Sequence, residues 1–189
     1  KFLVNRGISE RYFQKEAVDV IEEYGSGVIE VGTAGGKTIL YGSLVARLGV
    51  KTLVITIDLL SKNSTADEFI KFFGVDNVAL IESEDYDVPV VIANVQNLWA
   101  KFKSKSPEFL AFLNSIDLLI VNEAHHINES KLIHLADLGN TWYSLCQAIP
   151  AYFRVGGTGT VGKEGSLERA LITAAIGDVV YYKPTKELI

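Results

Sequence analysis

The chain has 189 residues and a formal net charge of −5 at pH 7, and 48% of its residues are hydrophobic against 22% that are charged. These values are typical of one folded domain with its own hydrophobic core, and they exclude a disordered or low-complexity chain. They also exclude a protein that holds nucleic acid by overall positive charge, so a polyanion would have to be bound by a local patch.

Short apolar runs alternate with helical patterns along the chain. Apolar residues at helical spacing from Phe13 to Tyr24 predict a first helix, with Ser9 as its N-cap and Gly25 as its C-terminal stop. Two further helices are predicted at 38–48 and 59–73, and strands at 28–31, 51–57, 78–81, 88–93, 117–121, 152–155 and 179–182. Most of these strands are continuous Val, Ile and Leu runs, which indicates burial on both faces of a sheet. We therefore expect a three-layer α/β fold in which a mostly parallel central sheet presents a ligand site at the carboxyl ends of its strands.

A loop of small residues follows the first predicted strand and leads into the predicted helix that begins at Thr38. Small residues let backbone N–H groups converge on a phosphate, and the start of the helix adds a positive field. Lys37 would reach the outer phosphates, and the Thr38 hydroxyl would bind Mg²⁺. The candidate phosphate-binding residues are Gly32, Thr33, Ala34, Gly35, Gly36, Lys37 and Thr38. The usual phosphate-loop pattern has glycine where Val31 stands.

A second polar stretch follows the buried strand predicted at 117–121. At such a strand end, a phosphate-loop enzyme places one acidic group near the shell of Mg²⁺ and another that polarises the attacking water. Asn122 and Glu123 occupy these two positions. We therefore expect Glu123 and Lys37 to be catalytic, with Thr38, Asn122 and Glu123 around the metal.

Together, the two stretches resemble motifs I and II of superfamily 2 helicases and translocases, and the resemblance covers nearly the whole chain. The chain is also similar in overall character to phage UvsW-type repair helicases and to the motor subunits of restriction enzymes. The resemblance implies that residues 1–189 form a first RecA-like, P-loop ATPase lobe that binds ATP and Mg²⁺. It implies DNA, or less favourably RNA, as a partner, and a second RecA-like lobe of the same polypeptide that completes the site.

The same resemblance assigns roles outside the two motifs. Arg11 and Gln14 match the Q motif that reads adenine, and Asn94 and Gln96 match a TxQ-type motif that contacts the nucleic-acid backbone. Three residues would couple hydrolysis to movement of the second lobe: His125, Thr158 and Thr160.

Trp99 to Lys105 mixes aromatic side chains with three lysines and has two interpretations. Lys101 and Lys103 could track phosphates while the aromatic rings stack on bases. We slightly prefer a solvated loop that Trp99 and Phe102 anchor to the core. The acidic run 82–87 is interpreted as an exposed turn that would repel a polyanion.

Asn122 is the main departure from the family pattern, which has aspartate there. A neutral amide offers Mg²⁺ one carbonyl oxygen and no charge, so metal retention and hydrolysis should both weaken. This leaves a second interpretation open, namely a nucleotide-gated nucleic-acid-binding module with impaired hydrolysis. A small-molecule kinase is a third and weaker interpretation.

No apolar run reaches the roughly 18 residues of a membrane span, and the first residues lack the apolar core of a secretory signal. A single cysteine, Cys146, cannot form an intramolecular disulfide. We therefore expect a cytoplasmic protein with no membrane partner. Because the chain contains no methionine, we also expect it to be a piece of a longer protein.

Overall fold

A parallel sheet forms the middle layer of the computed structural model, which describes residues 9–32, 36–128 and 141–187. The strands are β1 (Ser26–Val31), β2 (Thr52–Thr56), β3 (Val78–Leu80), β4 (Val90–Asn94), β5 (Leu118–Asn122), β6 (Phe153–Thr158) and β7 (Val179–Lys183). Their order across the sheet is β3-β4-β2-β5-β6-β1-β7, and each paired neighbour is parallel. All seven predicted strands are present, with ends shifted by a few residues. The predicted α/β class and parallel sheet are confirmed.

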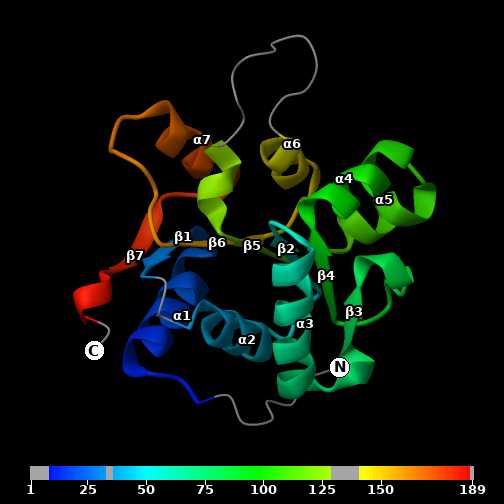
Figure 1. The fold of residues 1–189 in the computed structure, drawn as a ribbon, viewed down its shortest axis with the longest axis horizontal. Helices are drawn as coiled ribbons and strands as arrows, with labels where there is room; N and C mark the ends of the chain where they lie inside the picture. Colours follow the sequence, from blue (N-terminus) through cyan, green and yellow to red (C-terminus); the bar gives the residue numbers. More distant parts are fainter. Residues whose placement is uncertain (1–8, 33–35, 129–140, 188–189) are drawn as a thin grey trace.

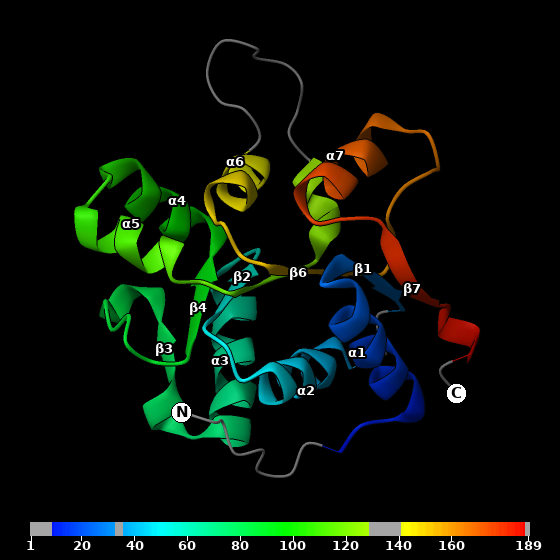
Figure 2. The same ribbon diagram turned by 180° about the vertical axis from the view of Figure 1, so that it is seen from behind.

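Helices cover both faces of this sheet, as the two opposite views show (Figures 1 and 2). One face packs against α1 (Tyr12–Tyr24), α2 (Lys37–Leu48) and α3 (Leu59–Phe73). The other packs against α4 (Val95–Ser104), α5 (Pro107–Asn114), α6 (Thr141–Ala148) and α7 (Leu167–Ala175). Every residue of β2 and β4 is buried because helices lie above and below them, which explains their continuous apolar sequences.

The three predicted helices are present and end where glycine was expected to stop them. Gly25 and Gly49 follow α1 and α2 in the left-handed conformation, at φ 76° and 62°. A left-handed residue is the common way to end a helix, and glycine adopts it without a Cβ penalty. The expectation that Ser9 caps the first helix is wrong: α1 begins after Arg11, whose backbone N–H donates to the side chain of Gln14 at 2.8 Å.

The preferred interpretation of Trp99 to Lys105 as a loop is also wrong, because most of this stretch lies in α4. The Asn94 side chain accepts a hydrogen bond from the backbone N–H of Asn97 and so caps this helix. Trp99 and Phe102 lie on one face, where their rings stack with centroids 5.6 Å apart and pack against the core. The aromatic residues therefore anchor a helix, not a loop.

Parallel strands bring their carboxyl ends to one edge of the sheet. Gly32 follows β1 there, while Asn94, Asn122 and Thr158 are the last residues of β4, β5 and β6. The polar residues predicted to form a site thus share one edge.

The described helices include none that is long and apolar enough to cross a membrane.

Candidate nucleotide-binding site

The carboxyl edge of the sheet brings together two side chains that are far apart in the sequence. Lys37 is the first residue of α2, and its Nζ lies 3.0 Å from Oε1 of Glu123, which follows β5. The Lys37 side chain is only 9% exposed and that of Glu123 is 28% exposed. An amino group and a carboxylate therefore form an ion pair in a partly enclosed position, where their attraction is screened less than at an open surface.

The backbone on both sides of this ion pair has an unusual conformation. Gly36 precedes Lys37 with φ 63°, and Glu123 has φ 61°, which costs a non-glycine residue free energy. The next residue, Ala124, is fully buried, and a Cβ on Gly156 would lie 2.9 Å from its own Cβ. The turn after β5 is thus packed tightly against β6, and this packing holds the Glu123 carboxylate near Lys37.

Gln14 connects the start of α1 to the phosphate-loop segment. It is 1% exposed, and its Nε2 donates to the backbone oxygen of Gly36 at 3.1 Å. Arg11, the other Q-motif residue, lies on the exposed side of the helix start. The structure therefore places the predicted adenine reader beside the predicted phosphate-binding residues.

Gly32 allows a close approach between the phosphate-loop segment and the last described residues. A Cβ at this position would lie 2.1 Å from Oγ1 of Thr185 and 3.0 Å from its Cα.

Thr38 is the half-buried second residue of α2, one position beyond Lys37. Three predicted phosphate-binding residues, Thr33, Ala34 and Gly35, lie outside the described residues.

Asn122 accepts a hydrogen bond that the sequence did not reveal. Its Oδ1 lies 3.3 Å from the hydroxyl of Tyr41, a fully buried residue of α2. Burial, and then the charge of Glu123, raises the pKa of Tyr41 far above its ordinary value, so the hydroxyl remains a donor. The one hint in the sequence is the Gly156–Gly157 doublet, because glycine inside a strand often marks a close approach.

The three predicted coupling residues form one polar chain next to Glu123. Nδ1 of His125 lies 3.0 Å from Oγ1 of Thr158 and 3.4 Å from Oε2 of Glu123. The Thr158 hydroxyl donates to the backbone oxygen of Thr160 at 2.9 Å and accepts from its N–H at 3.2 Å. This chain joins the end of β5 to the end of β6.

The four residues predicted to contact nucleic acid differ in their exposure and in their partners within the protein. Asn94 is 6% exposed and caps α4, and Lys101 pairs with Glu84. Gln96 and Lys103 are exposed. The structure therefore leaves these last two accessible on α4, while the other two side chains already have partners within the protein.

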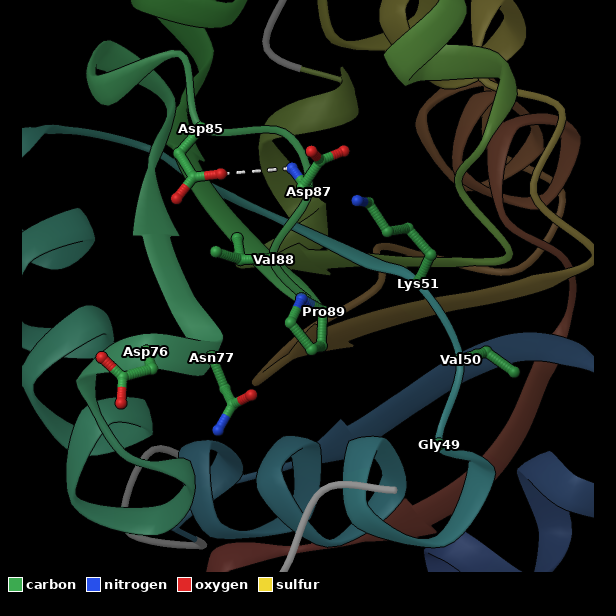
Figure 3. Close-up of a pocket in the computed structure, with 9 residues that line it drawn as sticks. All are labelled: Gly49, Val50, Lys51, Asp76, Asn77, Asp85, Asp87, Val88 and Pro89. Atoms are coloured by element: carbon green, nitrogen blue, oxygen red, sulfur yellow. Dashed lines mark hydrogen bonds between the residues drawn. The ribbon is translucent and has the colours of Figure 1, made fainter. Parts of the chain in front are cut away.

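A cavity of about 420 Å³ lies at the opposite edge of the sheet (Figure 3). Its lining includes Lys51, just before β2, and Pro89, just before β4. Asp85 and Asp87 also line it; residues 82–85 and 87 are exposed as predicted, whereas Tyr86 is half-buried and packs against the core. Because its carboxylates would repel a polyphosphate, this cavity is separate in place and in chemistry from the candidate site.

Residues 7–163 match the model of a protein family described as type III restriction enzyme, res subunit. A DNA 3'-5' helicase XPB from Kineococcus radiotolerans is 26% identical over 190 residues, covering 98% of this chain and 32% of the relative. A probable helicase D10 from Escherichia phage T5 is 27% identical over 158 residues, covering 82% of this chain and 31% of the relative. The chain thus spans about a third of the length of these curated relatives.

Solved structures share the fold. The UvsW helicase from bacteriophage T4 matches with a TM-score of 0.69 and 18% identity, covering 95% of this chain and 63% of that one. The Hef helicase domain of Pyrococcus furiosus matches with a TM-score of 0.75 and 16% identity, covering 98% of this chain and 41% of that one.

Proposed function

Because the chain belongs to the family of type III restriction enzyme res subunits and has the fold of the first RecA-like lobe of superfamily 2 helicases, we propose that it is the ATP-binding lobe of a nucleic-acid-dependent ATPase. The observation that carries this proposal is the meeting of Lys37 with Glu123 at the carboxyl edge of the sheet. Ligands of open parallel sheets bind at that edge. We propose DNA over RNA as the track, and a second lobe that completes the site.

Nucleotide binding would separate Glu123 from Lys37. The outer phosphates of ATP carry more negative charge than one carboxylate and would take Glu123's place beside Lys37. The released carboxylate could then orient a water for in-line attack on the γ-phosphate. His125 lies 3.4 Å from the second oxygen of Glu123, so it would restrain that carboxylate after its release.

The side chains at this edge suit Mg²⁺ bound together with a nucleotide. Thr38, Asn122 and Glu123 supply oxygen atoms, which this hard cation prefers. The described residues contain no group of three or more His, Cys, Asp and Glu side chains that would hold a metal alone. Mg²⁺ typically relies on one or two protein groups plus waters and substrate phosphates, so the donor set fits. When bound, the metal would neutralise charge on the phosphoryl group that is transferred.

Asn122 supports one alternative, a module that binds nucleic acid under nucleotide control with little hydrolysis. The amide is neutral and its oxygen already accepts a hydrogen bond from Tyr41. Measuring the ATPase rate of the full-length protein with and without DNA or RNA separates the two proposals. Strong stimulation supports the motor, whereas nucleotide-dependent nucleic-acid binding without turnover supports the module.

Replacing Lys37 tests the nucleotide site directly. ATP with Mg²⁺ at 100 times its dissociation constant should stabilise the parent protein by about 2.7 kcal/mol. We expect Lys37→Ala to abolish this stabilisation, measured as the thermal shift of each variant against its own nucleotide-free sample. Lys71→Ala is the matched control, because Lys71 is exposed near the end of α3 that lies away from the site. An equal shift in Lys37→Ala and the control contradicts the proposed function.

A further inference from the structure

Tyr41 has a place in the site that the predicted machinery leaves unexplained. It lies one helical turn after Lys37 on α2 and is 1% exposed. Its hydroxyl donates to Oδ1 of Asn122 at 3.3 Å. A buried tyrosine needs a partner for its hydroxyl, and here that partner is the residue at the proposed metal position.

Gly157 makes this contact possible. A Cβ there would lie 1.7 Å from the Tyr41 hydroxyl oxygen and 2.8 Å from the ring carbon that bears it. Gly157 is also the register partner of Asn122 between β5 and β6. Glycine inside a strand lacks a side chain to pack, so the phenol fills the space beside Asn122 that any other residue would occupy. The three residues thus form one unit at the carboxyl edge.

The hydrogen bond determines how the side chain of residue 122 is presented. Alternation along β5 directs Asn122 to the face that packs against α2, where Ile120 also lies. A phenol hydroxyl donates one hydrogen bond, and an amide oxygen has two lone pairs. The bond therefore directs the oxygen, not the NH₂ group, toward Tyr41 and leaves one lone pair of that oxygen for another donor. A metal-bound water is such a donor.

We propose that Tyr41 is a positioning residue that orients the side chain at position 122 toward the Mg²⁺ of a bound nucleotide. This inference rests on the proposed function. Tyr41 acts through residue 122 and contacts neither the nucleotide nor the metal. Its effect should therefore depend on which side chain stands at position 122.

A double-mutant cycle tests this dependence in the full-length protein. The variants are Tyr41→Phe, Asn122→Asp and the combination, and the assay titrates Mg²⁺ against binding of a fluorescent ATP analogue. Tyr41→Phe should raise the half-saturating Mg²⁺ concentration about threefold in the parent, because a neutral hydrogen bond is lost. In the Asn122→Asp background, Tyr41→Phe should raise the half-saturating Mg²⁺ concentration about tenfold, because a hydrogen bond to a carboxylate is stronger.

Tyr181→Phe is the matched control, since it removes a hydroxyl whose hydrogen bond, 2.8 Å to Glu16, lies away from Asn122. It should leave the Mg²⁺ titration unchanged. Thermal unfolding of each variant checks that it is folded at the assay temperature. Gly157→Ala provides a second route, because the added Cβ displaces the phenol and should raise the Mg²⁺ requirement as Tyr41→Phe does.

Two results overturn the inference while the proposed function stands. One is an unchanged Mg²⁺ titration in Tyr41→Phe when the parent binds the analogue. The other is an equal increase in both backgrounds, which would show that the phenol acts by packing alone. If the parent itself fails to bind the analogue, the proposed function fails and the inference falls with it.

Discussion

Lys62 is a buried lysine whose ion-pair partner, Glu82, is exposed to solvent. Its side chain on α3 is 2% exposed, and its Nζ pairs with Glu82, which is 41% exposed. Glu82 also accepts a hydrogen bond from Asn97 of α4. One carboxylate therefore links helices that lie on opposite faces of the sheet, and the two ends of the ion pair differ sharply in their access to solvent.

This difference predicts unequal effects of removing either partner. Breaking a buried pair costs about 3–5 kcal/mol when a charge is left uncompensated. Glu82→Gln leaves the Lys62 ammonium buried but keeps one oxygen acceptor, so we expect a loss of about 2 kcal/mol. Lys62→Met removes the buried charge at similar volume and leaves a carboxylate that water can reach, so we expect a loss below about 1 kcal/mol.

Urea denaturation at pH 7 measures both changes in the free energy of unfolding. The double variant should recover most of the loss caused by Glu82→Gln, because no buried charge remains without a partner. A larger loss in Lys62→Met than in Glu82→Gln would refute the reasoning, since it would show that burial of the ammonium is not the dominant cost.

The effect of Glu82→Gln should also depend on pH. Burial raises the pKa of Glu82, but hydrogen bonds from Lys62, the backbone and Asn97 outweigh burial and hold that pKa below its ordinary value of 4.5. The unfolded state therefore takes up the proton first, and the stabilisation by this carboxylate is present above pH 4.5 and is lost as the pH falls. The difference between parent and variant should shrink in acid, and a constant difference down to the acid unfolding range would contradict this.

Three further outcomes are expected. Asn122→Asp should raise ATP turnover of the full-length protein by about tenfold or more, because a carboxylate attracts Mg²⁺ better than an amide; an unchanged rate would refute that role. Arg154→Met should lower the free energy of unfolding by about 3 kcal/mol, because Arg154 donates to the backbone oxygens of Cys146, Ile149 and Ala175; a loss as small as that of exposed Lys163→Met would contradict this. Burial raises the pKa of Cys146 to about 12, so iodoacetamide at pH 8 should modify it only after denaturant is added; rapid labelling of the native protein would show that the thiol is accessible.

The sequence predicted the sheet well because buried parallel strands have a simple pattern. The runs at 51–57, 88–93 and 117–121 proved to be buried inner strands, as packing on both faces requires, whereas the runs at 78–81 and 179–182 are the partly buried edge strands β3 and β7. The meeting of Lys37 with Glu123 also followed, because loops after parallel strands share one edge.

Helix α4 and the contacts of Tyr41 were missed for different reasons. Val95, Leu98, Trp99 and Phe102 have helical spacing, but the stretch was interpreted as a solvated loop that its aromatic residues anchor to the core. Tyr41 reads as an ordinary core residue of α2, and no local pattern shows which strand end its hydroxyl reaches. Burial of Lys62 was equally invisible, since lysine is almost always placed on the surface.

The carboxylate of Glu123 is occupied as long as it neutralises Lys37. While Oε1 contacts the lysine at 3.0 Å, Lys37 sets the orientation of the carboxylate, and one of its acceptor sites is unavailable to an attacking water. In the proposed enzyme, a domain that has no polyphosphate to offer Lys37 would thus keep its own base sequestered. Substrate binding and release of the base would then be one event, so the base would become available to a water only when a triphosphate is present.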